Sequence, residues 1–336
     1  MQDLVTIWGA LALALAVTGA AGTVLSHYGD VISSKTGLSG SWIGLVLMAT
    51  ITSLPELSTG ISAVTIGQAP NIAAGDALGS CVFNLVMFAL LDMMLRDKPL
   101  YAEISDSHTL GATFGIVLIG IVGLGILIAP LGAPFALGHV GIVTPVLVVA
   151  YAYIMWAVFL REREANAMAE LIDRYPEITL RTAVTRYAIA ALFVVAAGIS
   201  LPFIGKELSS AMGWSTSFVG TLFVAGVTSA PELVVTAAAM RIGAIDMAAG
   251  NLLGSNLFNM LVVAIDDLAF LDGSLLGSIR QVHASSALSA IVMSAVVIAA
   301  LQSRAHRKIY RLPSLPSVVL IAVYAVNAWV LFRDGG

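Results

Sequence analysis

Long apolar runs separated by short polar segments dominate the chain. A helix that crosses a bilayer needs about 20 mainly apolar residues. Runs of this kind occur ten times, near residues 4–26, 41–66, 72–95, 108–130, 139–160, 187–205, 215–240, 246–270, 281–302 and 315–332. The pattern therefore predicts an all-α polytopic membrane protein with ten transmembrane helices.

The one sizeable polar segment, residues 161–186, divides these runs into two groups of five. It holds five basic and five acidic residues, which is typical of a solvated loop. We expect a first five-helix repeat at 1–160, a loop at 161–186 and a second five-helix repeat at 187–336. Because each half has an odd number of spans, the second must cross the membrane upside down relative to the first.

Composition supports a membrane protein. Of the 336 residues, 59% are hydrophobic and 11% are charged, whereas soluble domains carry about 25% charged residues. No Lys or Arg precedes the first apolar run, which argues against a cleaved signal peptide. The single cysteine, Cys81, excludes an intramolecular disulfide. We expect lipid and small inorganic cations as partners and no nucleic acid, with the oligomeric state left open.

Basic residues predict the orientation, because they concentrate in cytoplasmic loops. With the N-terminus outside, 13 of the 16 Lys and Arg residues lie inside and 3 outside. The inside set is Lys35, Arg96, Lys98, Arg161, Arg163, Arg174, Arg181, Arg186, Arg241, Arg304, Arg307, Lys308 and Arg311. We therefore expect both termini outside and the 161–186 loop in the cytoplasm, in a prokaryotic cell membrane.

Two motifs occur once in each half. The sequence TSLPEL at 52–57 recurs as TSAPEL at 228–233, with five of six positions identical. The sequence GDALGSCVFN at 75–84 recurs as GNLLGSNLFN at 250–259, with six of ten identical. Inverted repeats that meet near the bilayer midplane are a recurring transporter architecture.

The glutamate of each first motif falls in the middle of an apolar run. A charged side chain at this depth costs about 3 kcal/mol on insertion scales. No Lys or Arg occurs between Lys35 and Arg96, or between Lys206 and Arg241, to pair with these carboxylates. A proton or a cation from solution must then neutralise Glu56 and Glu232.

Helical spacing gathers further oxygen ligands around each glutamate. Residues at i, i+3, i+4 and i+7 share one helix face, and each proline loosens a backbone carbonyl four residues earlier. Two such faces result, formed by Ala49, Thr52, Ser53 and Glu56 and by Ala225, Thr228, Ser229 and Glu232. Hard oxygen ligands of this kind suit Ca²⁺ and Na⁺ better than zinc or copper.

The second motif adds polar residues at four-residue spacing. These are Asp76, Ser80 and Asn84 in the first half and Asn251, Ser255 and Asn259 in the second. Glycines at the same spacing permit close helix packing, which would bring the Ser and Asn side chains to the glutamate of a neighbouring helix. Asp76 lies about 12 Å along the helix from Asn84, so we expect it on an entry path.

These motifs resemble the α-repeats of the sodium/calcium exchanger family. The resemblance is specific at about 49–84 and 225–259. It implies a ten-helix fold, alternating access and Ca²⁺ coordination by Glu56, Glu232, Thr52 and Thr228. It also implies Na⁺ sites and backbone carbonyl ligands at Ser53, Ser229, Ser80, Ser255, Asn84, Asn259, Ala49 and Ala225.

Three features depart from the family pattern. Ile51 and Val227 precede the Thr-Ser pairs, where many relatives carry Gly. Asn259 stands where some Na⁺-coupled members carry Asp, and Asp76 replaces the Asn that Asn251 retains. The favoured function is a secondary antiporter that exchanges Ca²⁺ for Na⁺, without a cofactor. Because the site has lost one acidic group at Asn259, Ca²⁺/H⁺ antiport on the same site is the alternative.

Other functions fit the sequence less well. An intramembrane hydrolase would need a metal motif such as HExxH or a nucleophile with a base, and no such motif and no mid-span histidine occurs. We therefore do not expect an enzyme. A selective channel would couple no second ion. Asp92 and Asp267, each eight residues after a motif Asn, are either cation-attracting groups at opposite mouths or interfacial residues without a role.

Overall fold

A computed structural model gives the structure of residues 4–95, 98–129, 136–166, 174–212, 224–303 and 312–335. The first half contains α1 (Leu4–Thr36), α2 (Gly40–Trp42), the π-helix η1 (Ile43–Met48), α3 (Ala49–Thr52), α4 (Leu54–Thr65), α5 (Pro70–Met94), α6 (Leu100–Glu103), α7 (His108–Ile128), β1 (Ala136–Leu137), β2 (Val140–Gly141) and α8 (Val143–Asn166). The second contains α9 (Leu180–Met212), α11 (Val224–Thr228), α12 (Ala230–Arg241), α13 (Ile245–Ala269), α14 (Leu275–Ser278), α15 (His283–Ser303) and α16 (Leu315–Gly335). The all-α membrane fold class is confirmed.

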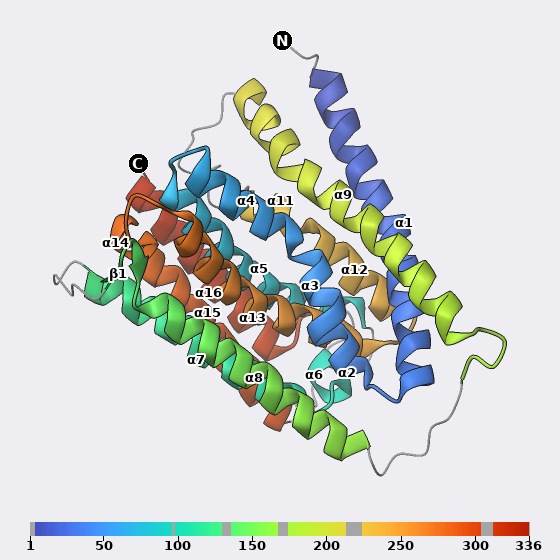
Figure 1. Cartoon of the computed structure of the whole chain (residues 1–336). Coiled ribbons are helices and arrows are strands. Elements are labelled where there is room, and N and C mark those ends of the chain that lie inside the picture. Colours follow the sequence, from blue (N-terminus) through green and yellow to red (C-terminus); the bar gives the residue numbers. More distant parts are fainter. Residues whose placement is uncertain are drawn as a thin grey trace.

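Helix boundaries repeat from one half to the other. Helices α1 and α9 are both 33 residues long and begin 176 positions apart (180 − 4). Helices α5 and α13 are both 25 residues long and begin 175 apart (245 − 70), and α7 and α15 are both 21 residues long with the same offset (283 − 108). Figure 1 shows α1 and α9 side by side and running in opposite directions, as an inverted repeat requires.

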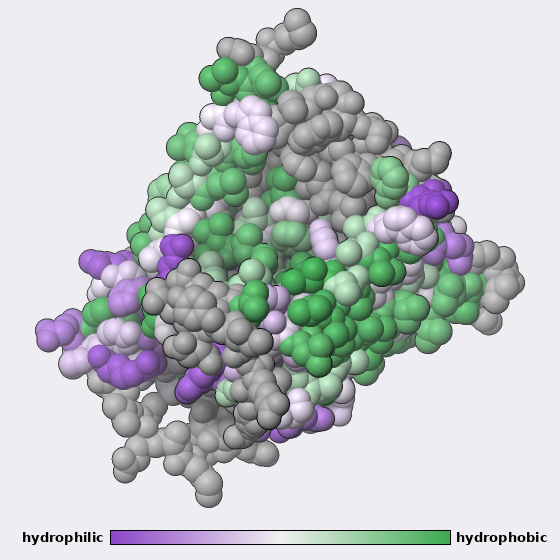
Figure 2. Space-filling view, turned by 180° about the vertical axis from the view of Figure 1, so that it is seen from behind, coloured by the Kyte–Doolittle hydropathy of each residue, from purple (hydrophilic) through white to green (hydrophobic). Residues whose placement is uncertain are grey.

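Nine helices among the described residues are long and apolar enough to cross a membrane. Hydrophobic residues cover much of the face in Figure 2, and hydrophilic residues gather toward its margins. The expected span at 215–240 is described only from Val224, where it forms α11 and α12; residues 213–223 lie outside the described part. With its counterpart α3–α4 in the first half, this broken helix completes the ten-helix pattern.

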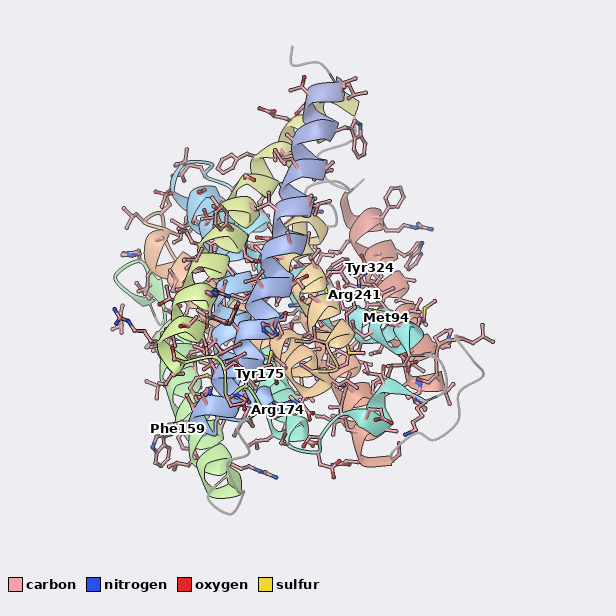
Figure 3. The ribbon with its side chains drawn as sticks, turned by 90° about the vertical axis from the view of Figure 1, so that its right-hand side faces the viewer. Met94, Phe159, Arg174, Tyr175, Arg241 and Tyr324 are labelled. Atoms are coloured by element: carbon pink, nitrogen blue, oxygen red, sulfur yellow. The ribbon has the colours of Figure 1, made fainter. Side chains whose placement is uncertain are left out.

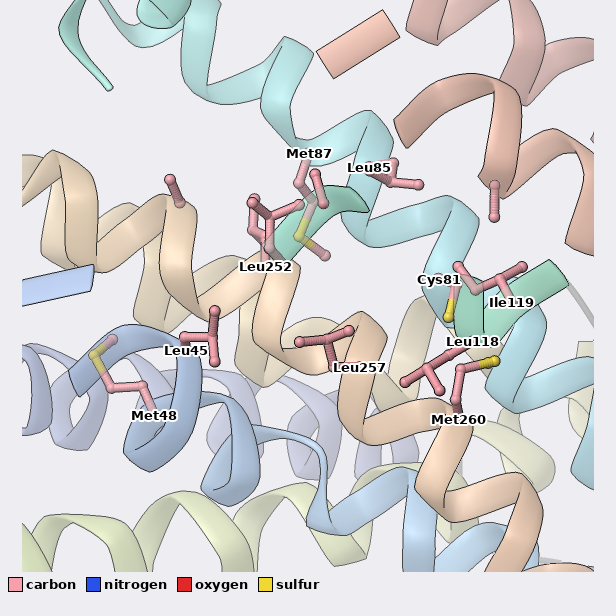
Figure 4. Close-up of a cluster of buried hydrophobic side chains, with 14 of the residues drawn as sticks. Leu45, Met48, Cys81, Leu85, Met87, Leu118, Ile119, Leu252, Leu257 and Met260 are labelled. Atoms are coloured by element: carbon pink, nitrogen blue, oxygen red, sulfur yellow. The ribbon is translucent and has the colours of Figure 1, made fainter. Parts of the chain in front are cut away.

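Helix α13 lies at the centre of the bundle, and 89% of its most apolar 18-residue stretch is buried. It packs against η1, α5 and α7, and Figure 4 shows the shared core of Leu45, Leu85, Leu118 and Leu252. A Cβ atom at Gly254 would lie 2.1 Å from the Leu45 backbone oxygen, so only glycine permits this approach. The close packing expected from the motif glycines is present at this crossing.

Several boundaries differ from the expected ones. The first helix continues to Thr36 and packs along α9, and the run at 139–160 begins as a hairpin, with its helix starting at Val143. Helices α8 and α9 extend into the expected 161–186 loop and leave only 167–179 between them. Figure 3 places Arg174 and Tyr175 of this connection beside α1, where both contact Asp30. The division into two repeats and a cytoplasmic loop stays a prediction.

Candidate cation-binding site

Each first motif breaks its helix at the serine. Ser53 has φ −93° and ψ 8° between α3 and α4, and Ser229 has φ −83° and ψ 7° between α11 and α12. These angles lie in the sparsely populated bridge region, and a proline occupies the first turn that follows. The break places Glu56 and Glu232 in the first turn of α4 and α12, where the helix dipole favours negative charge.

Both glutamates are sealed from solvent. Glu56 is 1% exposed and Glu232 is fully buried. The ion pairs in the described part join Lys98 to Glu103, His108 to Asp246 and Arg174 to Asp30, so none of them reaches either glutamate. Within the described residues, no basic side chain compensates the charge of the two carboxylates, as the sequence predicts.

The two halves exchange hydrogen bonds at the glutamates. Ser53 Oγ donates to Glu232 Oε1 at 2.8 Å, and Ser229 Oγ donates to Glu56 Oε1 at 3.0 Å. The second-motif serines contact the same carboxylates, since Ser80 Oγ lies 3.4 Å from Glu56 Oε1 and Ser255 Oγ lies 3.4 Å from Glu232 Oε1. Every predicted serine therefore reaches a carboxylate, and the crossed pairing joins both repeats in one centre.

In the described part of the chain, no hydrogen-bond donor reaches the remaining glutamate oxygens. Glu56 Oε2 and Glu232 Oε2 are buried and unpartnered within the described residues, as is Asn84 Oδ1. Both amide atoms of Asn259 are also buried without a hydrogen bond, although this amide lies close to the Cys81 thiol. Unsatisfied buried oxygens are costly, and a cation among them would remove the penalty.

The threonines connect the centre to the flanking positions. Thr52 Oγ1 lies 3.3 Å from Asn251 Oδ1, and Thr228 Oγ1 donates to Asp76 Oδ1 at 2.8 Å. The predicted backbone ligands are close by, because Ala49 O accepts from the Ser53 amide at 3.0 Å. Ala225 O accepts from the Ser229 amide at the same distance. The structure thus brings all the predicted site residues into one buried region.

One polar residue at this centre was missed by sequence reasoning. Asn256, the repeat counterpart of Cys81, accepts from Asn84 Nδ2 at 3.1 Å and donates to the Cys81 carbonyl at 3.3 Å. It lies where α5 crosses α13. The mismatch between GSC and GSN in the aligned motifs was the available signal.

Asp92 and Asp267 act as structural caps. Asp92 accepts hydrogen bonds from the backbone N–H groups of Leu100 and Ser314, both at 2.8 Å. Asp267 accepts from those of Leu275 at 2.6 Å and Gly141 at 2.8 Å. Each carboxylate therefore closes the loop after its own helix and holds a second loop. The hypothesis that they attract cations at the mouths finds no support in this geometry.

The two histidines at the start of α7 and α15 are buried. His108 Nε2 lies 3.1 Å from Ser41 Oγ and 3.2 Å from Asp246 Oδ1. His283 Nε2 lies 3.2 Å from Asn71 Oδ1, the counterpart of Asp246. These equivalent contacts tie helix ends together on opposite faces, away from the central glutamates.

Asp266 is a second residue that sequence reasoning missed. It is fully buried in α13, and both of its carboxylate oxygens lack a hydrogen bond within the described part. It lies beside Asp267 in the apolar run 246–270. Its repeat counterpart is Leu91, so no repeated motif marks it.

The oxygen-only character of the centre limits the ions that it suits. No group of three or more His, Cys, Asp or Glu side chains is placed to hold a metal in the described ranges. The centre instead combines two carboxylates with hydroxyl, amide and carbonyl oxygens, which are the ligands of hard cations. Two inverted repeats with discontinuous helices that meet at a buried polar centre define the class of secondary transporters.

Comparison with known proteins identifies the family. The model of the family "Sodium/calcium exchanger protein" matches residues 6–161 and 182–333. The chain belongs to this family, and it is a cation/Ca²⁺ antiporter of the membrane. The family resemblance seen in the two motifs is confirmed.

Sequence relatives and solved structures agree with this assignment. An uncharacterized membrane protein from Methanocaldococcus jannaschii is 28% identical over 70% of this chain and 75% of its own length. The inner membrane protein YrbG from Escherichia coli is 24% identical over 70% of each chain. The sodium-calcium exchanger NCX_Mj soaked with 10 mM Na⁺ and 10 mM Sr²⁺ has the same fold, with a TM-score of 0.73 at 20% identity over 96% of this chain and 98% of that one.

Proposed function

We propose that the protein exchanges Ca²⁺ for Na⁺ across a cell membrane, with both ions using the centre formed by Glu56 and Glu232. The observation that carries this proposal is the pair of buried oxygens Glu56 Oε2 and Glu232 Oε2, which have no hydrogen-bond partner among the residues that the structure describes. No described ion pair compensates either carboxylate. A bound cation therefore completes the charge balance of the folded protein.

The ligand set supports both ions. Ca²⁺ takes six to eight oxygens, and the centre offers the two glutamates with the Thr52 and Thr228 hydroxyls. Na⁺ ions would distribute over the same oxygens with help from a second group. That group is Ser53, Ser229, Ser80, Ser255, Asn84, Asn259 and the carbonyls of Ala49 and Ala225. Either load neutralises the charge of −2 on the two glutamates.

Competition between Ca²⁺ and Na⁺ for the two glutamates explains why the protein exchanges the ions and does not let either pass alone. An empty centre would carry two uncompensated carboxylates through an apolar environment, which is costly. A centre loaded with Ca²⁺ or with Na⁺ avoids this cost. We infer that only loaded states change the side to which they open, so that one ion leaves only when another replaces it.

The orientation is part of the proposal. The excess of Lys and Arg predicted for one side places both termini outside and residues 161–186 in the cytoplasm. Arg174 and Arg186 of this segment lie near the end of α1, beside Asp30 and Tyr28. They therefore share one membrane face with Lys35.

The alternative is Ca²⁺/H⁺ exchange, in which two protons replace Na⁺ on the glutamates. Asn259 favours it, because an amide supplies no negative charge for an additional Na⁺.

Uptake of radiolabelled Ca²⁺ into proteoliposomes tests the proposal. Vesicles loaded with Na⁺ and diluted into Na⁺-free buffer should accumulate Ca²⁺, and vesicles with equal Na⁺ on both sides should not. Glu232→Gln should abolish the uptake, whereas Glu103→Gln, which alters an exposed pair with Lys98, should retain it. Uptake driven by a pH gradient in Na⁺-free buffer, with no response to Na⁺, would replace Na⁺ coupling with the alternative.

A further inference from the structure

The symmetry between the two halves breaks at three neighbouring pairs of equivalent positions, namely 60 and 236, 76 and 251, and 91 and 266. In the second half Thr236 of α12 faces Asn251 of α13, and Asn251 Nδ2 donates to Thr236 Oγ1 at 2.8 Å. The first-half counterparts are Gly60 and Asp76. A neutral hydrogen-bonded pair on one side is thus replaced by a glycine and a carboxylate on the other.

Asp266 occupies the space that Gly60 leaves. A Cβ atom at Gly60 would lie 2.2 Å from Asp266 Oδ2 and 2.6 Å from Asp266 Oδ1. Any larger residue would therefore displace this carboxylate. Position 91, the counterpart of Asp266, holds a leucine that is 1% exposed in the core. The glycine and the aspartate depend on each other, and neither has an equivalent in the other repeat.

Two carboxylates therefore lie on one side of the centre. Asp266 lies against Gly60 of α4. Gly60 lies one turn after Glu56, and Asp76 lies one turn before Ser80, which contacts Glu56, so Gly60 and Asp76 lie at one level of the packed helices α4 and α5. Their counterparts Thr236 and Asn251 are hydrogen-bonded to each other. Asp266 is fully buried and Asp76 is 1% exposed. Three of their four carboxylate oxygens, Asp266 Oδ1, Asp266 Oδ2 and Asp76 Oδ2, have no hydrogen-bond partner among the described residues.

Their place in the fold lies between the central glutamates and one membrane face. Helix α4 ends and α5 begins at that face, and Gly60 and Asp76 lie within the adjoining turns. Helix α13 ends there as well, three residues after Asp266. Because the halves are inverted, Thr236, Asn251 and Leu91 lie toward the opposite face.

We propose that Asp266 and Asp76 form a second cation site, which binds one Na⁺ between the centre and the membrane face at which α4 ends. This inference deepens the proposed function and rests on it. Uncompensated carboxylates in an apolar interior mark ion pathways. Three free carboxylate oxygens provide a small set suited to a monovalent ion, whereas Ca²⁺ takes six to eight ligands. On the route between the centre and this membrane face, Na⁺ would bind at an additional site, and the route to the opposite face has no equivalent site.

Equilibrium binding of radiolabelled Na⁺ to the purified, detergent-solubilised full chain tests the site. Asp266→Asn keeps the shape of the side chain, and Asp266→Leu installs the residue of the counterpart position. Both variants should bind one Na⁺ fewer per protein than the wild type, or bind it at least about tenfold more weakly, a factor that equals 1.4 kcal/mol. The matched control is Asp272→Asn, which removes an exposed charge just beyond the end of α13.

Radiolabelled Ca²⁺ binding separates this inference from the proposed function. Both Asp266 variants should keep the Ca²⁺ binding that Glu232→Gln removes. Unchanged Na⁺ binding in Asp266→Asn and Asp266→Leu would overturn the second site and leave the exchange proposal intact. A change in proton uptake with unchanged Na⁺ binding would overturn it equally. Absence of Ca²⁺ binding in the wild type would instead contradict the exchange proposal.

Discussion

At the motif serines and glutamates the two repeats are near copies of each other, but around Gly60 and Thr236 they differ. Ser53 and Ser229 donate across the centre at 2.8 and 3.0 Å, each to the glutamate of the other half. Toward one face Asn251 pairs with Thr236, whereas toward the other Asp266 lies against Gly60. The comparison agrees with the proposal that both access routes share the symmetric centre, whereas each route has its own lining where the halves differ.

The symmetric centre gives the largest expected effect. Glu56→Gln and Glu232→Gln should each lower Ca²⁺ exchange at least about 100-fold, because losing a charged ligand costs about 3 kcal/mol. The two losses should be similar, since the two carboxylates have equivalent partners. Initial rates in proteoliposomes measure both variants, with Glu103→Gln as the control. A strong loss in one variant and none in the other would show that the halves do not share the ion.

The capping aspartates give the next largest effect, on stability. Asp92→Asn and Asp267→Asn should each lower the free energy of unfolding by about 3 kcal/mol, because charge-assisted hydrogen bonds to loop N–H groups are weakened. Thermal melting in detergent measures the loss, and the exposed Asp272→Asn serves as the control. Exchange per folded protein should stay near the wild-type value. A selective loss of exchange in well-folded protein would restore the hypothesis that these groups attract cations.

The two threonines sharpen the comparison at a smaller scale. Thr228 donates to the carboxylate of Asp76, whereas Thr52 lies against the neutral amide of Asn251. Hydrogen bonds to charged groups contribute about 1.5–3 kcal/mol and neutral ones about 0.5–1.5 kcal/mol. Thr228→Ala should therefore destabilise the ion-free protein by about 1 kcal/mol more than Thr52→Ala. Equal melting shifts, judged against the exposed Thr113→Ala, would place the asymmetry elsewhere.

The smallest effect belongs to the connection between the halves. Arg174 Nη2 lies 2.7 Å from Asp30 Oδ1, with the arginine side chain 55% exposed. An ion pair this accessible contributes at most about 1 kcal/mol. Arg174→Ala should shift the melting temperature slightly, and the shift should shrink as salt is added. A large effect that is independent of salt would mean that this segment holds the halves together.

Much of the fold follows from the sequence, because apolar runs of membrane length and a repeated motif define spans and symmetry. The helix breaks follow as well, since Pro55 and Pro231 remove backbone donors at matching positions. Helix ends were less predictable. The polar end of α1 packs against the start of α9, where Arg186 lies over the ring of Tyr28, so hydropathy alone predicts an end ten residues before Thr36.

The centre of the site was predicted more fully than its flank. Repetition marks Glu56 and Glu232, and an alignment of the halves selects their neighbours. Asp266 escaped this reasoning because its counterpart is Leu91 and its contact with Gly60 joins positions far apart in sequence. A residue that occurs in one repeat and depends on a long-range contact leaves no periodic signal. Only the folded structure shows that it lies against Gly60, at the level of Asp76.

Crystals of the protein soaked in Sr²⁺, a heavier analogue of Ca²⁺, provide the most direct test of the central claim. Anomalous diffraction locates the bound ion independently of transport. The account predicts a peak coordinated by Glu56 Oε2 and Glu232 Oε2 together, which addition of Na⁺ removes. A peak held by neither glutamate, or one that Na⁺ leaves unchanged, would contradict it.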